Sequence, residues 1–251
     1  MPADARAAAI VPPPHLAGLD PALLADLVDA NRILFRQGVV DAFGHISVRH
    51  PLRPAHFLLA RNLAPGLATA ADIEEFDAES EPVRADAPRP YLERFIHGEI
   101  YRARPDVISV VHSHAASVIP FGLVPTRRLR AVYHMAGFLG TGVNVFEIRC
   151  CSGHATDLLI RSRAQGAALA AALGGQSVVL MRGHGCTVAA SDIRLAVFRA
   201  VYTKANAELQ AQALALGAPV YLTAEECEAA ARNVGGQIAR PWELWRRDAW
   251  S

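Results

Sequence analysis

The chain has 251 residues, of which 52% are hydrophobic, and its 25 basic and 24 acidic side chains leave a net charge of +1. This apolar content is ample for a folded core and excludes a disordered chain. The charges are interspersed without a basic stripe, so we expect neither a nucleic-acid nor a membrane partner. The length suits one large domain.

The chain has four cysteines: Cys150, Cys151, Cys186 and Cys227. They form no C-x-x-C motif, so we expect reduced thiols and a cytoplasmic protein. The apolar run near the start contains three prolines and is too short for a signal peptide or a membrane span. We therefore expect an N-terminal arm at residues 1–20 and one domain at 21–251.

Helix and strand signals are mixed along the chain without an internal repeat. Asp20 and Pro21 predict the start of a first helix, which ends near Gly38. Strands are predicted at residues 43–51, 56–62, 106–114 and 176–185. Further helices are predicted at 90–104, at 154–174, from the cap Ser191 to about 216, and at 223–235. This pattern favours a single-domain α/β fold with a mixed or largely antiparallel sheet flanked by helices.

Two histidines end the strand predicted at 106–114. His112 and His114 are two residues apart, so their side chains point to the same face of the strand and can chelate one metal ion. A bare His-x-His pair is more often a hydrogen-bonded or exposed pair than a metal site, so the motif alone does not establish a metal.

Two further residues extend this pair. His184 lies between Gly183 and Gly185, which permit a tight turn and close approach of a ligand, although an ordinary turn histidine fits as well. Glu93 lies on the helix that precedes the His-x-His strand, where a solvated carboxylate is the alternative. Three histidines and one carboxylate leave room for substrate oxygens, as in catalytic rather than structural metal sites.

Together, Glu93, His112-x-His114 and the "RGHG" segment around His184 resemble the class II aldolase/adducin superfamily. The resemblance takes in "DAFGHISVRHP" and "TAADIEEFD" and covers roughly residues 22–217. It implies an α/β/α sandwich with a mainly antiparallel sheet, commonly assembled as a homotetramer. It also implies one divalent ion per subunit, zinc, manganese or cobalt, held by the three histidines, with Glu93 as an acid/base residue that can approach the metal.

The chain departs from the sugar-phosphate aldolases of this superfamily at their phosphate site. His45 stands in the place of an asparagine, Arg61 and Asn62 lie near the position of a Ser-Gly pair, and Tyr91 and Leu92 precede Glu93 where serines are usual. Small hydroxyls and backbone amides suit a phosphate dianion, whereas Tyr and Leu do not. We therefore predict that the phosphate site is lost.

Other residues near these motifs suggest a flat, carboxylated substrate. Arg49, Arg61, His50 and Tyr91 are candidates to bind it, since the arginine fork suits a carboxylate. Structural pairing of Arg49 and solvent exposure of Arg61 are the alternatives. His45 and Tyr202 are candidate catalytic residues, although Tyr202 also fits a core or interface aromatic.

The same segments resemble the branch of the superfamily that decarboxylates hydroxylated aromatic or pyridine dicarboxylates. We therefore expect a metal-dependent carbon–carbon lyase, with decarboxylation favoured. An aldolase acting on a non-phosphorylated substrate and a non-catalytic, adducin-like interaction domain are the alternatives.

Overall fold

The computed structural model describes residues 10–251. Of the arm predicted at residues 1–20, residues 1–9 lie outside this part. The remainder contains the short 3-10 helix η1 (Pro14–Leu16). Leu16 and Leu19 are buried in the hydrophobic core, so this half of the predicted arm packs against the body.

A seven-stranded sheet forms the centre of the described chain, in the order β3-β2-β1-β4-β7-β6-β5. Its strands are β1 (His45–Arg49), β2 (Phe57–Ala60), β3 (Ile73–Phe76), β4 (Ser109–Ser113), β5 (Asn144–Phe146), β6 (Val178–Met181) and β7 (Gly185–Ala190). Neighbouring strands are antiparallel, apart from the parallel pair β5 and β6. The predicted α/β class with a mixed, mainly antiparallel sheet is confirmed.

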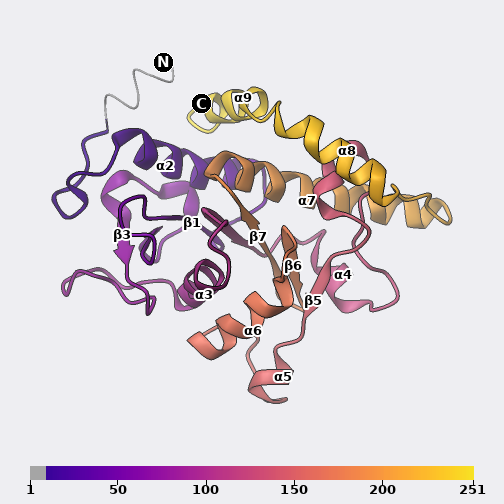
Figure 1. Ribbon diagram of the computed structural model, residues 1–251, viewed down its shortest axis with the longest axis horizontal. Coiled ribbons are helices and arrows are strands. Elements are labelled where there is room, and N and C mark those ends of the chain that lie inside the picture. Colours follow the sequence, from indigo (N-terminus) through magenta and orange to yellow (C-terminus); the bar gives the residue numbers. More distant parts are fainter. Residues whose placement is uncertain (1–9) are drawn as a thin grey trace.

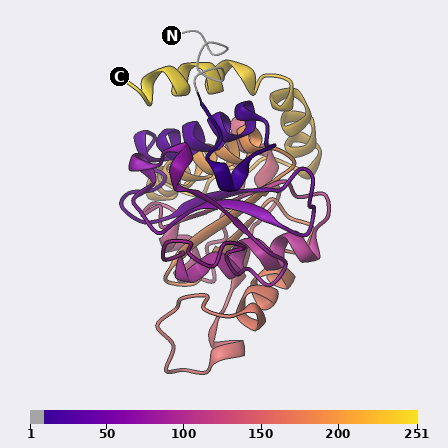
Figure 2. The ribbon, with the colours of Figure 1, turned by 90° about the vertical axis from the view of Figure 1, so that its left-hand side faces the viewer.

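Helices cover both faces of the sheet (Figures 1 and 2). One layer holds α2 (Pro21–Arg36) and α7 (Ile193–Leu216), and the opposite layer holds α3 (Phe95–Ala103) and α6 (Arg163–Leu173). The other helices are α4 (Ile119–Leu123), α5 (Arg149–Ser152), α8 (Ala224–Gly235) and α9 (Ala239–Asp248), and the other 3-10 helices are η2 (Pro65–Leu67), η3 (Ala70–Asp72), η4 (Leu92–Arg94) and η5 (His134–Leu139). Among residues 10–251, no helix is both long and apolar enough to cross a membrane.

Several predicted helix starts agree with the capping chemistry. The Asp20 side chain accepts a hydrogen bond from the Ala22 N–H and caps α2. Thr223 and Glu226 form a capping box at the start of α8, the helix predicted at 223–235. The cap of α7 is Asp192 rather than Ser191, because the Asp192 carboxylate accepts from the Leu195 N–H.

The prediction of a helix at 154–174 was wrong for the first half of this range, which is not helical. It begins at Arg163, where the Ser162 side chain caps it, and residues 153–162 form a loop. Leu158 in this loop has φ of 70°, a left-handed conformation that a helix cannot contain. The strand predicted at 176–185 proved to be the first arm of the β6–β7 hairpin, whose turn carries His184.

Candidate metal centre

Polar side chains gather at one end of the sheet, on the three strands β1, β4 and β7. His45 pairs with His112, and His112 pairs with Thr187. Arg61 directly follows the end of β2, the strand that pairs with β1. Residues in register point to the same face, so these side chains border one region of the sheet.

Four side chains converge there with potential ligand atoms within 4.8 Å of one another: Glu93, His112, His114 and His184. The Nε2 atom of His114 lies 3.0 Å from that of His112 and 2.9 Å from that of His184. Oε2 of Glu93 lies 3.5 Å from Nε2 of His112 and 3.4 Å from Nε2 of His184. The sequence-predicted metal set is thus brought together.

Backbone carbonyls fix the orientation of two of these rings. Nδ1 of His184 lies 2.9 Å from the Leu158 carbonyl oxygen, which can only accept, so this nitrogen carries the proton. His112 is likewise hydrogen-bonded to the Cys186 carbonyl. Each bond leaves the lone pair on Nε2, the atom that faces the other ligands, as is usual for metal-binding histidines.

Two glycines make the His184 turn possible. Gly183 has φ of 67°, which favours glycine. A Cβ atom on Gly185 would lie 2.0 Å from the Ser113 carbonyl oxygen, so β7 can approach β4 this closely only with glycine there. The close contact brings His184 to the strand that carries His112 and His114.

Glu93 is buried and charged. Burial raises the pKa of its carboxyl, but the nearby His112 and His184 rings lower it more strongly, and the net shift is downward. Its Oε1 accepts a hydrogen bond of 2.9 Å from the Ile160 N–H, which also favours the carboxylate. An ionised Glu93 fits a metal ligand or a base, rather than the protonated proton donor that the sequence analysis allowed.

The rings of His112 and His114 are neutral at ordinary pH. Burial lowers the pKa of both rings. For His114, burial together with the neighbouring His112 and His184 rings lowers the pKa to about 4. Neutral imidazoles with converging lone pairs, beside an ionised carboxylate, are the donor set that a borderline divalent metal requires. The four residues therefore fit such an ion, although the donor set does not select zinc, manganese or cobalt.

The loop 153–162 holds two of the four candidate ligands in place, and the sequence analysis missed it. The Leu158 carbonyl binds His184 and the Ile160 N–H binds Glu93. Both contacts use the backbone, so no side-chain signal in "HATDLLIRS" marks them. Leu158 has a left-handed backbone conformation, and Ile160 is fully buried.

Two residues predicted to bind substrate lie at the other end of β1. Arg49 donates hydrogen bonds to the carbonyls of Val107, Pro54, Tyr101 and Arg104. The guanidinium is therefore committed to the backbone, four residues along the strand from His45. His50 follows it and accepts hydrogen bonds from the Leu52 and Arg53 N–H groups. The geometry places neither residue beside the metal ligands.

Other predicted residues border the centre. The ring centroids of Tyr91 and His45 are 4.7 Å apart, and those of His45 and His112 are 5.1 Å apart. Arg61 pairs through Nε with Oδ1 of Asp72 at 2.7 Å, and 39% of its side chain remains exposed. Arg61 is therefore available to a molecule bound at this end of the sheet. Tyr91 and His45 border it as buried rings, and the Tyr91 hydroxyl donates a hydrogen bond to the Leu63 carbonyl.

Tyr202 lies on α7, on the face of the sheet opposite α3. The centroid of its ring lies 4.4 Å from that of Phe198, 6.1 Å from that of Trp245 and 6.3 Å from that of Tyr133. Within this chain it belongs to an aromatic cluster under α9 and does not approach the metal ligands. A catalytic role for Tyr202 could then arise only at another subunit's site.

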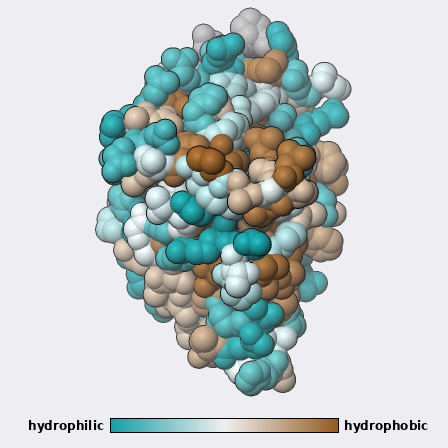
Figure 3. Space-filling model, turned by 90° about the vertical axis from the view of Figure 1, so that its right-hand side faces the viewer, coloured by the Kyte–Doolittle hydropathy of each residue, from teal (hydrophilic) through white to brown (hydrophobic). Residues whose placement is uncertain are grey.

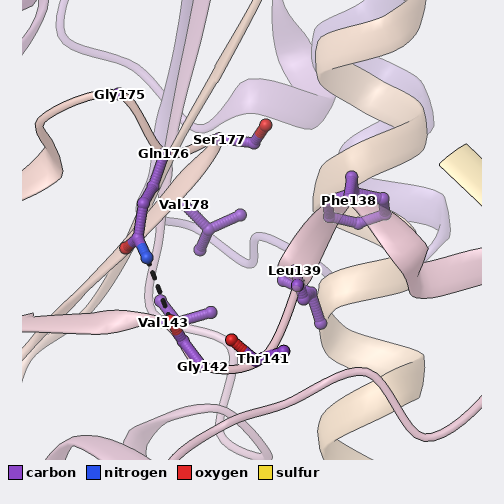
Figure 4. A pocket seen from close by; sticks show the side chains of 10 residues that line it. Phe138, Leu139, Thr141, Gly142, Val143, Gly175, Gln176, Ser177 and Val178 are labelled. Carbon is purple, nitrogen blue, oxygen red and sulfur yellow. Dashed lines mark hydrogen bonds between the residues drawn. The ribbon is translucent and has the colours of Figure 1, made fainter. Parts of the chain in front are cut away.

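A separate cavity of about 280 Å³ lies between η5 and the start of β6 (Figure 4). Phe138, Thr141, Gln176 and Ser177 contribute to its lining, and the Gln176 amide donates to the Gly142 carbonyl across it. No acid, base or metal ligand is among its lining residues, so this cavity offers none of the groups that converge at the histidine centre.

Comparison with known proteins identifies the family of the chain. Residues 25–211 match the family described as the Class II Aldolase and Adducin N-terminal domain. The chain is 38% identical to the decarboxylase tropJ of Talaromyces stipitatus, over 88% of this chain and 91% of that protein. It is 33% identical to a 3,4-dihydroxyphthalate decarboxylase of Terrabacter, over 81% of this chain and 86% of that protein. An aldolase II superfamily protein from Pseudomonas syringae shares its fold, with a TM-score of 0.73, 21% identity and coverage of 90% and 91%.

Proposed function

The chain belongs to the class II aldolase and adducin family, and from that premise we propose that it is a metal-dependent decarboxylase of a hydroxylated aromatic or heteroaromatic (di)carboxylate. One observation carries the proposal. The three-histidine, one-glutamate centre is assembled, whereas the buried Tyr91 and His45 rings lie where sugar-phosphate aldolases are expected to hold phosphate. The similarity to two proteins named as decarboxylases supports the same reaction.

A divalent ion held by His112, His114, His184 and Glu93 would supply Lewis acidity next to the carbon–carbon bond that breaks. The surrounding residues suit an aromatic acid. The Phe43 ring is 66% exposed and lies 6.5 Å from His114, so it offers a flat apolar surface. Arg61 offers the nitrogen atoms that Asp72 leaves free to a substrate carboxylate.

The step itself is the loss of carbon dioxide from a ring carbon beside a hydroxyl. The hydroxyl donates electrons to the ring, so that the carbon bearing the carboxylate takes up a proton and becomes tetrahedral. As carbon dioxide leaves, the electron pair of the breaking bond returns to the ring and restores the aromatic phenol or phenolate. Since Glu93 is ionised, this proton reaches the ring from solvent or from a donor other than the resting Glu93 carboxyl.

Product analysis tests the proposal and separates it from the aldolase alternative. The metal-loaded protein is incubated with 3,4-dihydroxyphthalate and, separately, with L-fuculose 1-phosphate, while carbon dioxide and trapped aldehyde are measured. We expect carbon dioxide from a hydroxylated aromatic acid and no aldehyde. Aldehyde formation without carbon dioxide from any member of an aromatic-acid panel would establish an aldolase instead.

Self-association is a further part of the proposal. The face that carries α4, α8 and the end of α7 shows a gathering of hydrophobic residues (Figure 3). Exposed apolar side chains on these segments include Leu123, Val124, Leu216 and Val220. Apolar surface of this kind is typical of subunit contacts, and together with the family membership it supports a homo-oligomer, expected to be a tetramer. Sedimentation velocity measures the assembly directly, and a monomer would contradict it.

A further inference from the structure

A chain of four buried polar side chains runs behind the metal centre. Nδ1 of His45 lies 2.6 Å from Nε2 of His97, and Nδ1 of His97 lies 2.6 Å from Oγ of Ser47. Oγ of Ser47 lies 2.7 Å from the hydroxyl of Tyr101. All four side chains are at most 4% exposed. The chain begins at His45, beside the candidate ligand His112, and ends at Tyr101 on α3.

Each link needs one donor and one acceptor, so the direction of one proton fixes all the others. A phenol is a better donor and a poorer acceptor than an aliphatic hydroxyl, so Tyr101 donates to Ser47. The alternative acceptor for Tyr101 is the Ile108 carbonyl, which is 3.4 Å away and already accepts from the Arg49 N–H at 2.7 Å. The short Ser47 contact is therefore the favoured one.

The remaining links follow from this start. Ser47 has accepted from Tyr101, so its own proton goes to Nδ1 of His97. His97 then carries its proton on Nε2 and donates it to Nδ1 of His45. His45 consequently carries its proton on Nε2, and no hydrogen bond occupies this atom within residues 10–251.

Both rings are neutral in this arrangement. Burial, reinforced by the neighbouring His112, lowers the pKa of His97 to about 3. The His45 ring is buried as well, with 4% of its surface exposed, and its Nδ1 faces His97. With one proton per ring, the chain has only two possible polarities, and they differ in whether His45 offers a donor or an acceptor to the site.

We propose that Tyr101, Ser47 and His97 are positioning residues that hold His45 with its proton on Nε2, as a neutral hydrogen-bond donor to an anionic oxygen of the substrate. This rests on the proposed function, since the oxygen belongs to the aromatic carboxylate. It assigns recognition of an acceptor, a carboxylate or phenolate, to the position where sugar-phosphate aldolases are expected to hold phosphate. His45 touches the substrate, and His97 acts through it.

The direct test is nitrogen-15 NMR of the histidine rings in the zinc-loaded, full-length protein. We expect both His45 and His97 to be protonated on Nε2 and not on Nδ1. Protonation of both rings on Nδ1 would overturn the proposal. This readout needs no turnover, so a protein that releases no carbon dioxide would refute the proposed function and leave the tautomer result standing.

A matched pair of variants tests the consequence for binding. In His97→Gln the amide can accept from Ser47 and donate to His45, whereas in His97→Met both links are lost. Phthalate is the probe, measured by calorimetry on zinc-loaded protein, and zinc content is checked in each variant. We expect about tenfold weaker phthalate binding in His97→Met, the loss of one hydrogen bond to a charged group, and near-normal binding in His97→Gln. Equal affinity in wild type and His97→Met, or no phthalate binding by the wild type, would contradict the proposal.

Discussion

Substitution of Gly185 by alanine is expected to open the metal centre by separating two strands. The added Cβ would lie 2.0 Å from the Ser113 carbonyl oxygen and 3.1 Å from the Cα of His114. An ordinary contact begins at 3.4 Å, so the two backbones must move apart by about 3.4 − 2.0 = 1.4 Å. Metal–ligand distances tolerate only about 0.2 Å, so a shift of this size between β4 and β7 disturbs coordination by His114 and His184.

The expected size of the effect follows from overpacking, which costs roughly 2 kcal/mol at a rigid site and corresponds to about a thirtyfold loss of metal affinity. Zinc affinity is measured by competition with a chromophoric chelator, and Tm by circular dichroism. Gly175→Ala is the matched control, because nothing lies within 4 Å of a Cβ there. If Gly185→Ala binds zinc as tightly as Gly175→Ala, the close approach of β7 to β4 does not position the ligands.

Three other outcomes are expected. Glu93→Gln keeps a hydrogen-bond acceptor for the Ile160 N–H but loses the negative charge of the carboxylate, so zinc affinity should fall about 10- to 100-fold in the same competition assay. Unchanged zinc affinity would show that Glu93 is not a ligand. The lysine of Arg49→Lys cannot reproduce the four hydrogen bonds that Arg49 donates to carbonyls, so the free energy of unfolding should fall by about 1–3 kcal/mol while KM stays unchanged. A raised KM would instead indicate that Arg49 binds substrate. His97 stays neutral in the folded protein down to about pH 3, because burial lowers its pKa, but it takes up a proton near pH 6.5 when unfolded, so the free energy of unfolding should fall as the pH falls through this window. Urea unfolding between pH 7 and 5 should therefore show a dependence of this free energy on pH that is up to about 1.4 kcal/mol per pH unit shallower in His97→Gln than in the wild type. Identical pH dependences would argue against a buried neutral His97.

The grouping of the candidate metal ligands was predictable because their signals are local. His112 and His114 share a strand face by the two-residue period, and the glycines beside His184 mark a close turn. The structure adds the reason for the second glycine, which is the contact with the Ser113 backbone. Capping residues such as Asp20 and Thr223 were equally legible, since a cap acts within three residues of its own position.

What the sequence could not supply are contacts between distant segments. Leu158 and Ile160 act through backbone groups, so their side chains carry no trace of the bonds to His184 and Glu93. The link between His45 and His97 spans 52 positions and depends on how α3 packs on the sheet. The hydrogen bonds of Arg49 were hidden for the same reason, since most of its carbonyl partners lie more than 50 residues away in the sequence.

The central claim is that one metal ion at this centre is required for decarboxylation. The most direct measurement is titration of the metal-free protein with zinc, manganese or cobalt while carbon dioxide release from a hydroxylated aromatic dicarboxylate is recorded. The account predicts that activity rises in proportion to bound metal, saturates at one ion per chain, and is absent in His112→Ala at every metal concentration. Full carbon dioxide release by metal-free protein would contradict it.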